Sequence, residues 1–312
     1  MTDIAGWPAI PFEPWKGTCA ALHLYTQIVG KYRLAHTPWV NHSWHATLYV
    51  NADGLTTGLV PDGPGIAVQF DLQRQRLIAS CSTGASESFA LEPMSVATFD
   101  NKFKKLIAAL GGSPEYHDFP NELPEATPFA ENSEARPWDA DAVSRFHRAL
   151  VRIDAVFNEF RTGFLGKVSP VHLFWGSFDL AVTRFSGQSA PLHPGGIPNL
   201  PDAVTREAYS HEVSSAGFWP GGSGIDEPCF YSYAYPTPDG FAEQPVRPLA
   251  ARFDKKLGEF VLPYEAIRSA LQPREALLEF LESTFGAAAR LATWDQRLTC
   301  AIGQKGLPRV VA

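Results

Sequence analysis

Histidine placement is the feature of the sequence that most directly suggests chemistry. His172 lies on an expected strand, His193 in a loop rich in Pro and Gly, and His211 on the next expected strand. Because adjacent strands lie about 4.8 Å apart, imidazoles on two strands and one on the loop could bind the same metal ion. Three imidazoles form the ligand set of zinc hydroxide sites and come close to that of ferrous oxygenases. The pattern favours a mononuclear centre with a divalent metal, Zn or Fe.

Weaker candidates surround this set. One carboxylate and three histidines of the first half are secondary ligand candidates: Glu212, His23, His42 and His45. Glu212 follows His211 directly, so in a regular strand it points to the opposite face. Asp179 comes seven residues after His172, an odd separation, so it should also face away. The alternative for every histidine is a partly buried side chain bonded to the backbone, the role assigned to His36, His117 and His147.

Aromatic side chains concentrate around the same strands and are expected to form the wall of a substrate pocket. The candidates for this wall are Trp175, Tyr209, Trp219 and Tyr233. The loop from Gly187 to Pro201 joins two of the His-bearing strands, so we expect it to form a rim or lid, with His193 facing the same cavity as His172 and His211. The alternative is that the aromatic residues belong to the core or to a sheet face.

Other catalytic motifs are weak. Ser177 follows Gly176 but lacks the second glycine of a nucleophile elbow, and no glycine-rich dinucleotide or phosphate loop occurs. The four cysteines, Cys19, Cys81, Cys229 and Cys300, are far apart and form no Cys-x-x-Cys pair. This usage favours reduced thiols in a cytoplasmic protein over a disulfide framework or a zinc ribbon.

The composition of the chain limits the classes of partner that we expect. The formal net charge of −7, without a cluster of Lys and Arg, disfavours nucleic acid, since phosphate binding needs a positive surface. No segment approaches the roughly 20 apolar residues of a membrane-spanning helix, and Met1–Pro11 does not have the pattern of a secretory signal. The partner we expect is a small-molecule ligand.

Two pairs of similar segments suggest an internal repeat. The run LHLYTQIVGKYRLA from Leu22 resembles VHLFWGSFDLAVTRF from Val171, and SFALEPMSV from Ser88 resembles EFVLPYEAI from Glu259. Each first segment is expected to be a strand, which would give His23 and His172 equivalent positions. The expected fold is α+β, with internally duplicated β-β-β-β-α units whose antiparallel sheets pack on a long amphipathic helix.

That helix defines the expected domain organisation. Apolar residues recur every three or four positions from about Asp139 to Leu165, with Asp139 as N-cap. Residues 1–112 would form the first strand-rich repeat, 113–138 a linker rich in Pro and acidic residues, and 139–312 the helix and the second repeat. We expect the halves to pack as one globule.

Several long segments carry a resemblance to a known family. They are WPAIPFEPWKGTCAALHLYTQIVGKYRL, TPWVNHSWHATLYV, SPVHLFWGSFDLAVTRFSG, AYSHEVSSAGFWPGG and YAYPTPDGFAE. On these motifs the chain resembles, over nearly its whole length, a bacterial family known as domain of unknown function 5996. The resemblance implies no activity.

The residues therefore lead to three hypotheses of different classes. The first is a metal-dependent enzyme that acts on a small molecule, in which the metal activates water or binds dioxygen. The second is a non-catalytic small-molecule binding protein with an aromatic-lined pocket. The third is an interaction module whose first half is a degenerate scaffold.

Overall fold

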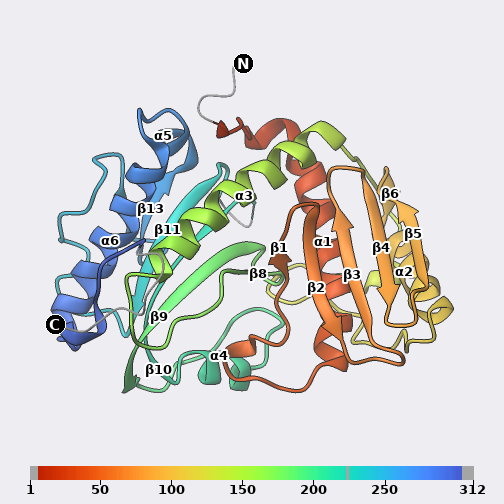
Figure 1. Cartoon of the computed structure of the whole chain (residues 1–312), viewed down its shortest axis with the longest axis horizontal. Coiled ribbons are helices and arrows are strands. Elements are labelled where there is room, and N and C mark those ends of the chain that lie inside the picture. The colour runs from red at the N-terminus through yellow and green to blue at the C-terminus, as the bar shows by residue number, and fades with distance from the viewer. Residues whose placement is uncertain (1–5, 223–224, 304–312) are drawn as a thin grey trace.

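Six helices and three antiparallel sheets make up the part of the chain that the computed structural model describes, residues 6–222 and 225–303 (Figure 1). The outer limits of the expected domains, residues 1 and 312, lie outside these residues. In chain order the elements are α1 (Phe12–His36), η2 (Asn41–Ser43), β1 (Tyr49–Val50), β2 (Gly54–Val60), β3 (Ile66–Asp71), β4 (Arg76–Cys81), β5 (Ser86–Ala90), β6 (Met94–Ser95), α2 (Val96–Ala109), η3 (Phe129–Glu131), β7 (Ala135–Arg136), α3 (Ala140–Arg161), β8 (His172–Phe174), β9 (Asp179–Ser189), α4 (Asp202–Ala208), β10 (His211–Trp219), β11 (Cys229–Tyr235), β12 (Arg252–Asp254), β13 (Glu259–Pro263), α5 (Tyr264–Arg268), α6 (Pro273–Leu291) and η4 (Gln296–Leu298).

The two large sheets meet at their edges. The first sheet has the order β1-β2-β3-β4-β5, and the second has the order β12-β13-β11-β10-β9-β8. Leu48, just before β1, exchanges two backbone hydrogen bonds with Leu173 of β8, at 3.0 and 2.7 Å between N and O. This single bridge links the edge strands, so the halves of the chain share one continuous framework. A third sheet of two strands pairs β6 with β7.

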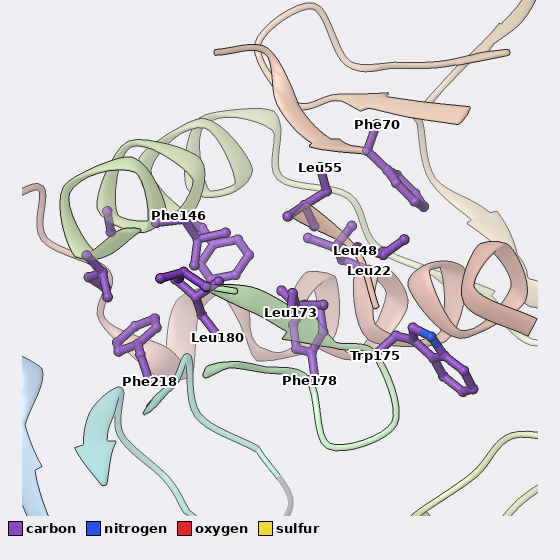
Figure 2. Close-up of a cluster of buried hydrophobic side chains, with 14 of the residues drawn as sticks. Leu22, Leu48, Leu55, Phe70, Phe146, Leu173, Trp175, Phe178, Leu180 and Phe218 are labelled. Carbon is purple, nitrogen blue, oxygen red and sulfur yellow. The ribbon is translucent and has the colours of Figure 1, made fainter. Parts of the chain in front are cut away.

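Part of the buried core lies where the two sheets meet. Figure 2 shows Leu48 and Leu55 of the first half beside Leu173, and Phe146 of α3 close to Leu180 of β9. These side chains are at most 1% exposed. Burial of one large apolar side chain contributes about 1.5–3 kcal/mol. The junction of the sheets is therefore a major source of stability, and α3 lies across it (Figure 1).

The expected amphipathic helix is confirmed as α3, with Asp139 as its N-cap. The Asp139 carboxylate accepts a hydrogen bond from the backbone N–H of Ala142 at 2.9 Å, which satisfies one of the free donors of the first turn. Its apolar face is buried against β9 and α6. The helix ends at Arg161, a few residues before the expected limit.

The segment from Leu22 is a helix, so the expectation of a strand there is wrong. It lies inside α1, whose residues 21–33 are all buried. A helix that is covered on every side has no solvent-exposed polar face. The alternation of apolar and polar residues every 3.6 positions, which identifies a surface helix, is therefore missing from its sequence. Aromatic and β-branched residues in such a segment look like a buried strand.

The expected duplication is not shown. Because His23 lies on α1 and His172 on β8, the two histidines do not occupy equivalent positions. The strand orders also differ, because β13 inserts between β11 and β12 whereas the first sheet is a plain meander. The second pair of segments keeps its likeness only in that β5 and β6 precede α2, and β13 precedes α5.

Several other expected elements are present. Short runs of apolar and β-branched residues predict strands at 66–72, 76–81 and 229–235, and these correspond to β3, β4 and β11. Apolar residues at helical spacing predict the helices that the structure shows as α2 and α6. A strand predicted in the same way at 44–50 is reduced to β1, and the sequence pattern does not predict β2. The glycine-rich turn after β10 includes Ser223 and Gly224, which lie outside the described residues. Within the described part of the chain, no helix is long and apolar enough to cross a membrane.

Candidate functional site

The three histidines expected to bind a metal occupy three different environments. His172 is fully buried on β8, with Nδ1 3.1 Å from the hydroxyl of Thr47, and burial lowers the pKa of its imidazole to about 3. His193 stacks on Tyr209 with 4.6 Å between ring centroids. His211 is exposed at the start of β10. Among the described residues, no group of three His, Cys, Asp or Glu side chains could hold a metal ion.

The secondary candidates are also dispersed. His23 lies on α1, where its Nε2 donates to the carbonyl of Gly176 at 2.9 Å, and burial lowers its pKa to about 4. His45 packs against Trp39, 4.6 Å between ring centroids. Glu212 is partly exposed at the start of β10. Of this set, only His42 lines the large cavity that is described next.

A cavity of about 1200 Å³ lies on one face of the second sheet. The four residues expected to form the wall of a pocket, Trp175, Tyr209, Trp219 and Tyr233, all line it. Ile197, Leu200 and Pro201 bring the loop before α4 to its rim. None of His172, His193 and His211 is among the described residues that line it, whereas His42 and His117 are.

Strand periodicity explains which side chains line the cavity. Asp179, Ala181, Thr183 and Phe185 alternate along β9, and all four line it. Since successive side chains on a strand point to opposite faces, the residues between them face α3 and α6. Strand pairing places Thr183 opposite Ser215 on β10, and Ser215 opposite Tyr233 on β11. One face of the sheet is therefore covered by helices and mostly apolar, apart from the buried Arg184, Ser214 and Ser232, and the other is aromatic and polar.

Asp179 faces the cavity, and the expectation that it points away from the face of His172 is wrong. The pairing of β8 with β9 sets Phe174 opposite Asp179 and His172 opposite Ala181, and opposed residues share a face. A tight turn of residues 175–178 separates the two strands. Counting odd and even positions across a turn has no meaning, because the chain reverses there.

Gly217 allows a tyrosine to reach this carboxylate across an intervening strand. Tyr231 on β11 extends over Gly217 on β10, and its hydroxyl donates to Oδ2 of Asp179 on β9. A β-carbon at Gly217 would overlap the Tyr231 ring, so only glycine leaves room for this path. The hydroxyl of Ser177 donates to the other oxygen, Oδ1. Asp179 is thus fixed by two hydroxyl groups in a nearly dry position.

Glu122 reaches the cavity from the segment expected to be a linker. Gln27 of α1 accepts from the N–H of Asn121 at 2.8 Å and donates to its carbonyl at 2.9 Å. Lys31, one turn further along the same face of α1, donates to the Asn121 side chain at 2.5 Å. The N–H of Glu122 donates to the carbonyl of Pro198 at 2.8 Å. These bonds hold the Glu122 side chain against Gly176, where a β-carbon would overlap it.

Comparison with known proteins identifies a family. DUF5996, described as a family of unknown function, matches residues 7–300. The chain belongs to this family. No curated protein and no solved structure matches the chain. The resemblance found in the sequence is confirmed, and for this member of DUF5996 the argument about function rests on the cavity itself.

The electrostatics of the cavity favour protonated carboxyl groups. Burial, and to a smaller extent the charge of Asp179, raise the pKa of Glu122 to about 7, although the Lys31 ammonium opposes this. Burial and the charges of Asp179 and Asp254 raise the pKa of Glu259 to about 8. Burial also raises the pKa of Asp179 itself, which its hydroxyl donors oppose. Such shifts in a cavity are typical of functional sites.

Unfavourable backbone conformations gather at the same place. In the described residues, seven non-glycine positions have positive φ: His42, Ser43, Gln75, Glu122, Phe178, Asn199 and Thr293. His42, Ser43, Glu122 and Asn199 all line the cavity, and Phe178 directly precedes Asp179. A left-handed non-glycine residue costs of order 1–3 kcal/mol, less for Asn, and persists only where the surroundings impose it. Clustering of this cost around one cavity points to a function there.

Lys31, Glu122 and Glu259 were not among the expected site residues, and Asp179 was expected to face away. One signal was available for the first of these, because His23, Gln27 and Lys31 are spaced by four residues, which is typical of one helix face. Asp179 also starts a regular alternation with Ala181 and Thr183. Glu122 has no local signal, since only tertiary contacts bring it to the cavity.

Proposed function

We propose that this protein binds a small organic molecule in the cavity on the second sheet. The observation that carries the proposal is the position of four left-handed non-glycine residues around a cavity of about 1200 Å³. Folding alone gives no reason to concentrate this strain in one place. Concave sites lined by aromatic groups with a few convergent polar groups are the usual form of ligand sites.

The environment of the polar groups supports the same proposal. Asp179, Thr183, Ser215 and Tyr233 lie on the cavity face of central strands, where apolar residues would pack more favourably. A binding site would give these groups a purpose that core packing does not. A metal centre at His172, His193 and His211 is not part of the proposal, since these residues form no group that could hold an ion.

Two substitutions on α4 test the proposal. Val204 lines the cavity, whereas its neighbour Ala203 is exposed and does not. Val204→Trp should fill part of the cavity and abolish binding of small aromatic fragments detected by ligand-observed NMR. Ala203→Trp, the matched control, should bind the same fragments as the wild type. Absence of binding to the wild type, or equal binding to both variants, would contradict the proposal.

A second candidate function is an enzyme that transfers protons. The observation that favours it is the neighbouring pair of Asp179, which is buried, and Glu122, which is partly buried: burial, and to a smaller extent the charge of Asp179, raise the pKa of Glu122 to about 7. General acids and bases operate best when their pKa is near the ambient pH. Asp179 is held by two hydroxyl donors, whereas Glu122 has no side-chain hydrogen bond within the described residues, so Glu122 is the more available proton carrier.

This second function has its own test. A fragment that binds in the cavity would be incubated with the protein in D₂O and followed by NMR for conversion or for uptake of deuterium at carbon. The enzyme hypothesis expects one of these in the wild type and neither in Glu122→Gln. Binding without either change, in both proteins, would leave a non-catalytic binding protein.

A further inference from the structure

The charged groups of the cavity are unequal in sign. Its described lining residues carry three carboxyl groups, those of Glu122, Asp179 and Glu259, but only one amine, Lys31. Lys31 donates to Asn121, and its ammonium lies 5.7 Å from the centre of the Trp175 ring, without an ion pair to any described carboxylate. Three carboxyl groups against a single amine favour a cationic ligand over an anionic one.

Two of these carboxyl groups have hydrogen-bonding capacity to spare. Asp179 accepts from Ser177 and Tyr231, whereas the side chains of Glu122 and Glu259 have no hydrogen-bond partner within the described residues. Oε2 of Glu259 is buried without a partner. A buried acceptor without a donor is rare in proteins and needs an explanation. An ammonium group, which has donors and no acceptor, matches this excess of acceptors.

A second observation, independent of the carboxyl groups, also points to a ligand. His42 is 5% exposed and lines the cavity, and its Nε2 has no partner, while Nδ1 lies 3.0 Å from the carbonyl of Ala208. The carbonyl accepts, so Nδ1 carries the proton and a neutral ring has a free acceptor at Nε2. Burial lowers the pKa of this imidazole, which favours the neutral form. The free group of His42 is thus another acceptor.

The walls suit the same class of ligand. Trp175, Tyr209, Trp219 and Tyr233 line the cavity together with the carboxyl groups. The hydroxyl of Tyr209 is 2.8 Å from that of Tyr233, and Trp219 packs on Tyr231 with 4.3 Å between ring centroids. The faces of aromatic rings carry negative potential and attract ammonium groups.

We propose that the cavity takes an organic cation, a small molecule whose amine or quaternary ammonium group binds the carboxylates of Glu122 and Glu259 among these aromatic rings. This inference rests on the proposed function and adds the chemical class of the ligand. A bound positive charge lowers the pKa of a neighbouring carboxyl group, so at pH values below 7 binding of the cation releases protons from Glu122 and Glu259 and leaves both as carboxylates. A neutral ligand would release none.

The test uses three probes of nearly equal shape: tryptamine, which is a cation, tryptophol, which is neutral, and indole-3-propionate, which is an anion. Titration calorimetry gives their affinities for the wild type. We expect tryptamine to bind about tenfold more tightly than tryptophol, as for a charge-assisted hydrogen bond, and indole-3-propionate to bind least. Glu122→Gln should weaken tryptamine about tenfold and leave tryptophol unchanged. Glu125→Gln, an exposed position nearby, is the matched control.

Proton release provides a readout that does not depend on a variant. Titrations of tryptamine at pH 6.5 in buffers of different ionisation enthalpy should show release of a substantial fraction of a proton, and titrations of tryptophol should show none. Equal affinity for tryptamine and tryptophol, or no proton release, would overturn the cation inference while the binding function remains. If aromatic fragments bind but tryptamine does not, the cation inference is also overturned. If nothing binds, the proposed function fails with it.

Discussion

The two large sheets differ in what covers their faces. In the first sheet the buried positions alternate with half-buried ones, as along β3, and the buried side packs on α2, where Phe70 stacks on Phe99. In the second sheet six of the nine residues of β10 are buried, on both faces. One face packs on α3 and α6, and the other lines the cavity. A strand that is buried on both faces is stabilised most when apolar side chains occupy both faces.

The departure from that expectation coincides with the proposed site. The covered cavity face of the second sheet contains Asp179, Thr183, Ser215 and Glu259, whereas the first sheet buries fewer polar residues, among them Thr57 and Asp71. Enclosing polar groups costs free energy unless they are bonded. The first sheet thus serves mainly as a scaffold, and the second combines scaffold and site.

The largest effect that can test this comparison is at His172. His172→Ala should lower the free energy of unfolding by about 2–4 kcal/mol, because it empties a buried space between Trp44 and Phe174 and removes the partner of Thr47. Urea denaturation measures this loss, and metal content per chain is measured on the same samples. A stable variant that has lost a stoichiometric metal would instead support a metal site.

A smaller effect is expected at Gly217, over which the Tyr231 side chain crosses β10 to reach Asp179. Gly217→Ala should cost about 1–3 kcal/mol, since the new methyl group displaces the Tyr231 ring, and should weaken fragment binding by releasing Asp179. The control is Gly286→Ala on α6, where a β-carbon meets nothing within 4 Å, and this should stabilise the protein by about 0.5–1 kcal/mol. Equal effects in thermal melts would contradict the crossing geometry.

The acidic face of the cavity gives a pH-dependent prediction. The folded pKa of Glu259, about 8, is above its ordinary value of 4.5, so the stability that its proton provides is complete below about pH 4.5 and is lost as the pH rises to about 8. Glu259→Gln should therefore match the wild type near pH 4.5 and be more stable by about 1–2 kcal/mol at pH 8.5. Chemical denaturation at both pH values measures this, with Glu243→Gln, an exposed position, as control.

Two buried histidines should have the opposite effect on the pH dependence of stability, because they destabilise the fold at acidic pH. The folded pKa values of His172 and His23, about 3 and about 4, are below the ordinary value of 6.5. The unfolded chain then takes up protons that the folded chain refuses, so stability is lost as the pH falls from about 6.5 towards 4. These two pH ranges overlap, and in the wild type the two losses together should give a maximum of stability at about pH 6 to 6.5, measurable in the same titration. Stability that rises steadily towards pH 4 would contradict the burial of these imidazoles.

Much of the fold could be predicted where the sequence pattern matches the local environment. β3 and β4 alternate between buried and more open positions, and α3 has one apolar face, so period and structure agree. For α1 the agreement fails, because burial on all sides removes the period. The false repeat follows from that error, since it paired part of a helix with a strand.

The site was harder to predict than the fold. Aromatic residues such as Tyr233 could be assigned to a pocket because they cluster along strands that were recognised. Glu122 could not be assigned to the pocket in this way. Its position depends on hydrogen bonds that Asn121 makes with Gln27 and Lys31 of α1, which are 90 or more residues away in the sequence. The emphasis on histidines was misplaced for a related reason: a residue type suggests chemistry, but its burial and its neighbours decide whether that chemistry is available.

The smallest expected effect is at His211. His211 is exposed, its Nδ1 lies 3.0 Å from the hydroxyl of the adjacent Ser210, and it does not line the cavity. His211→Ala should therefore change the free energy of unfolding by less than about 0.5 kcal/mol, the usual range for a surface substitution. It should also leave fragment binding unchanged, although its ring lies 6.4 Å from that of His42, between centroids.

His42→Ala is the informative partner of that variant, because His42 is buried and lines the cavity from the loop of the first half. Both proteins would be compared by urea denaturation and by tryptamine titration. Loss of binding in His42→Ala alone would indicate that Nε2 of His42 accepts a hydrogen bond from the ligand. It would also fit a cavity that the first half of the chain closes over the second sheet. Loss of binding or of metal in His211→Ala would mean that the binding surface extends to the start of β10. The proposed contrast between a first sheet that is a scaffold and a second sheet that encloses the site would then be wrong.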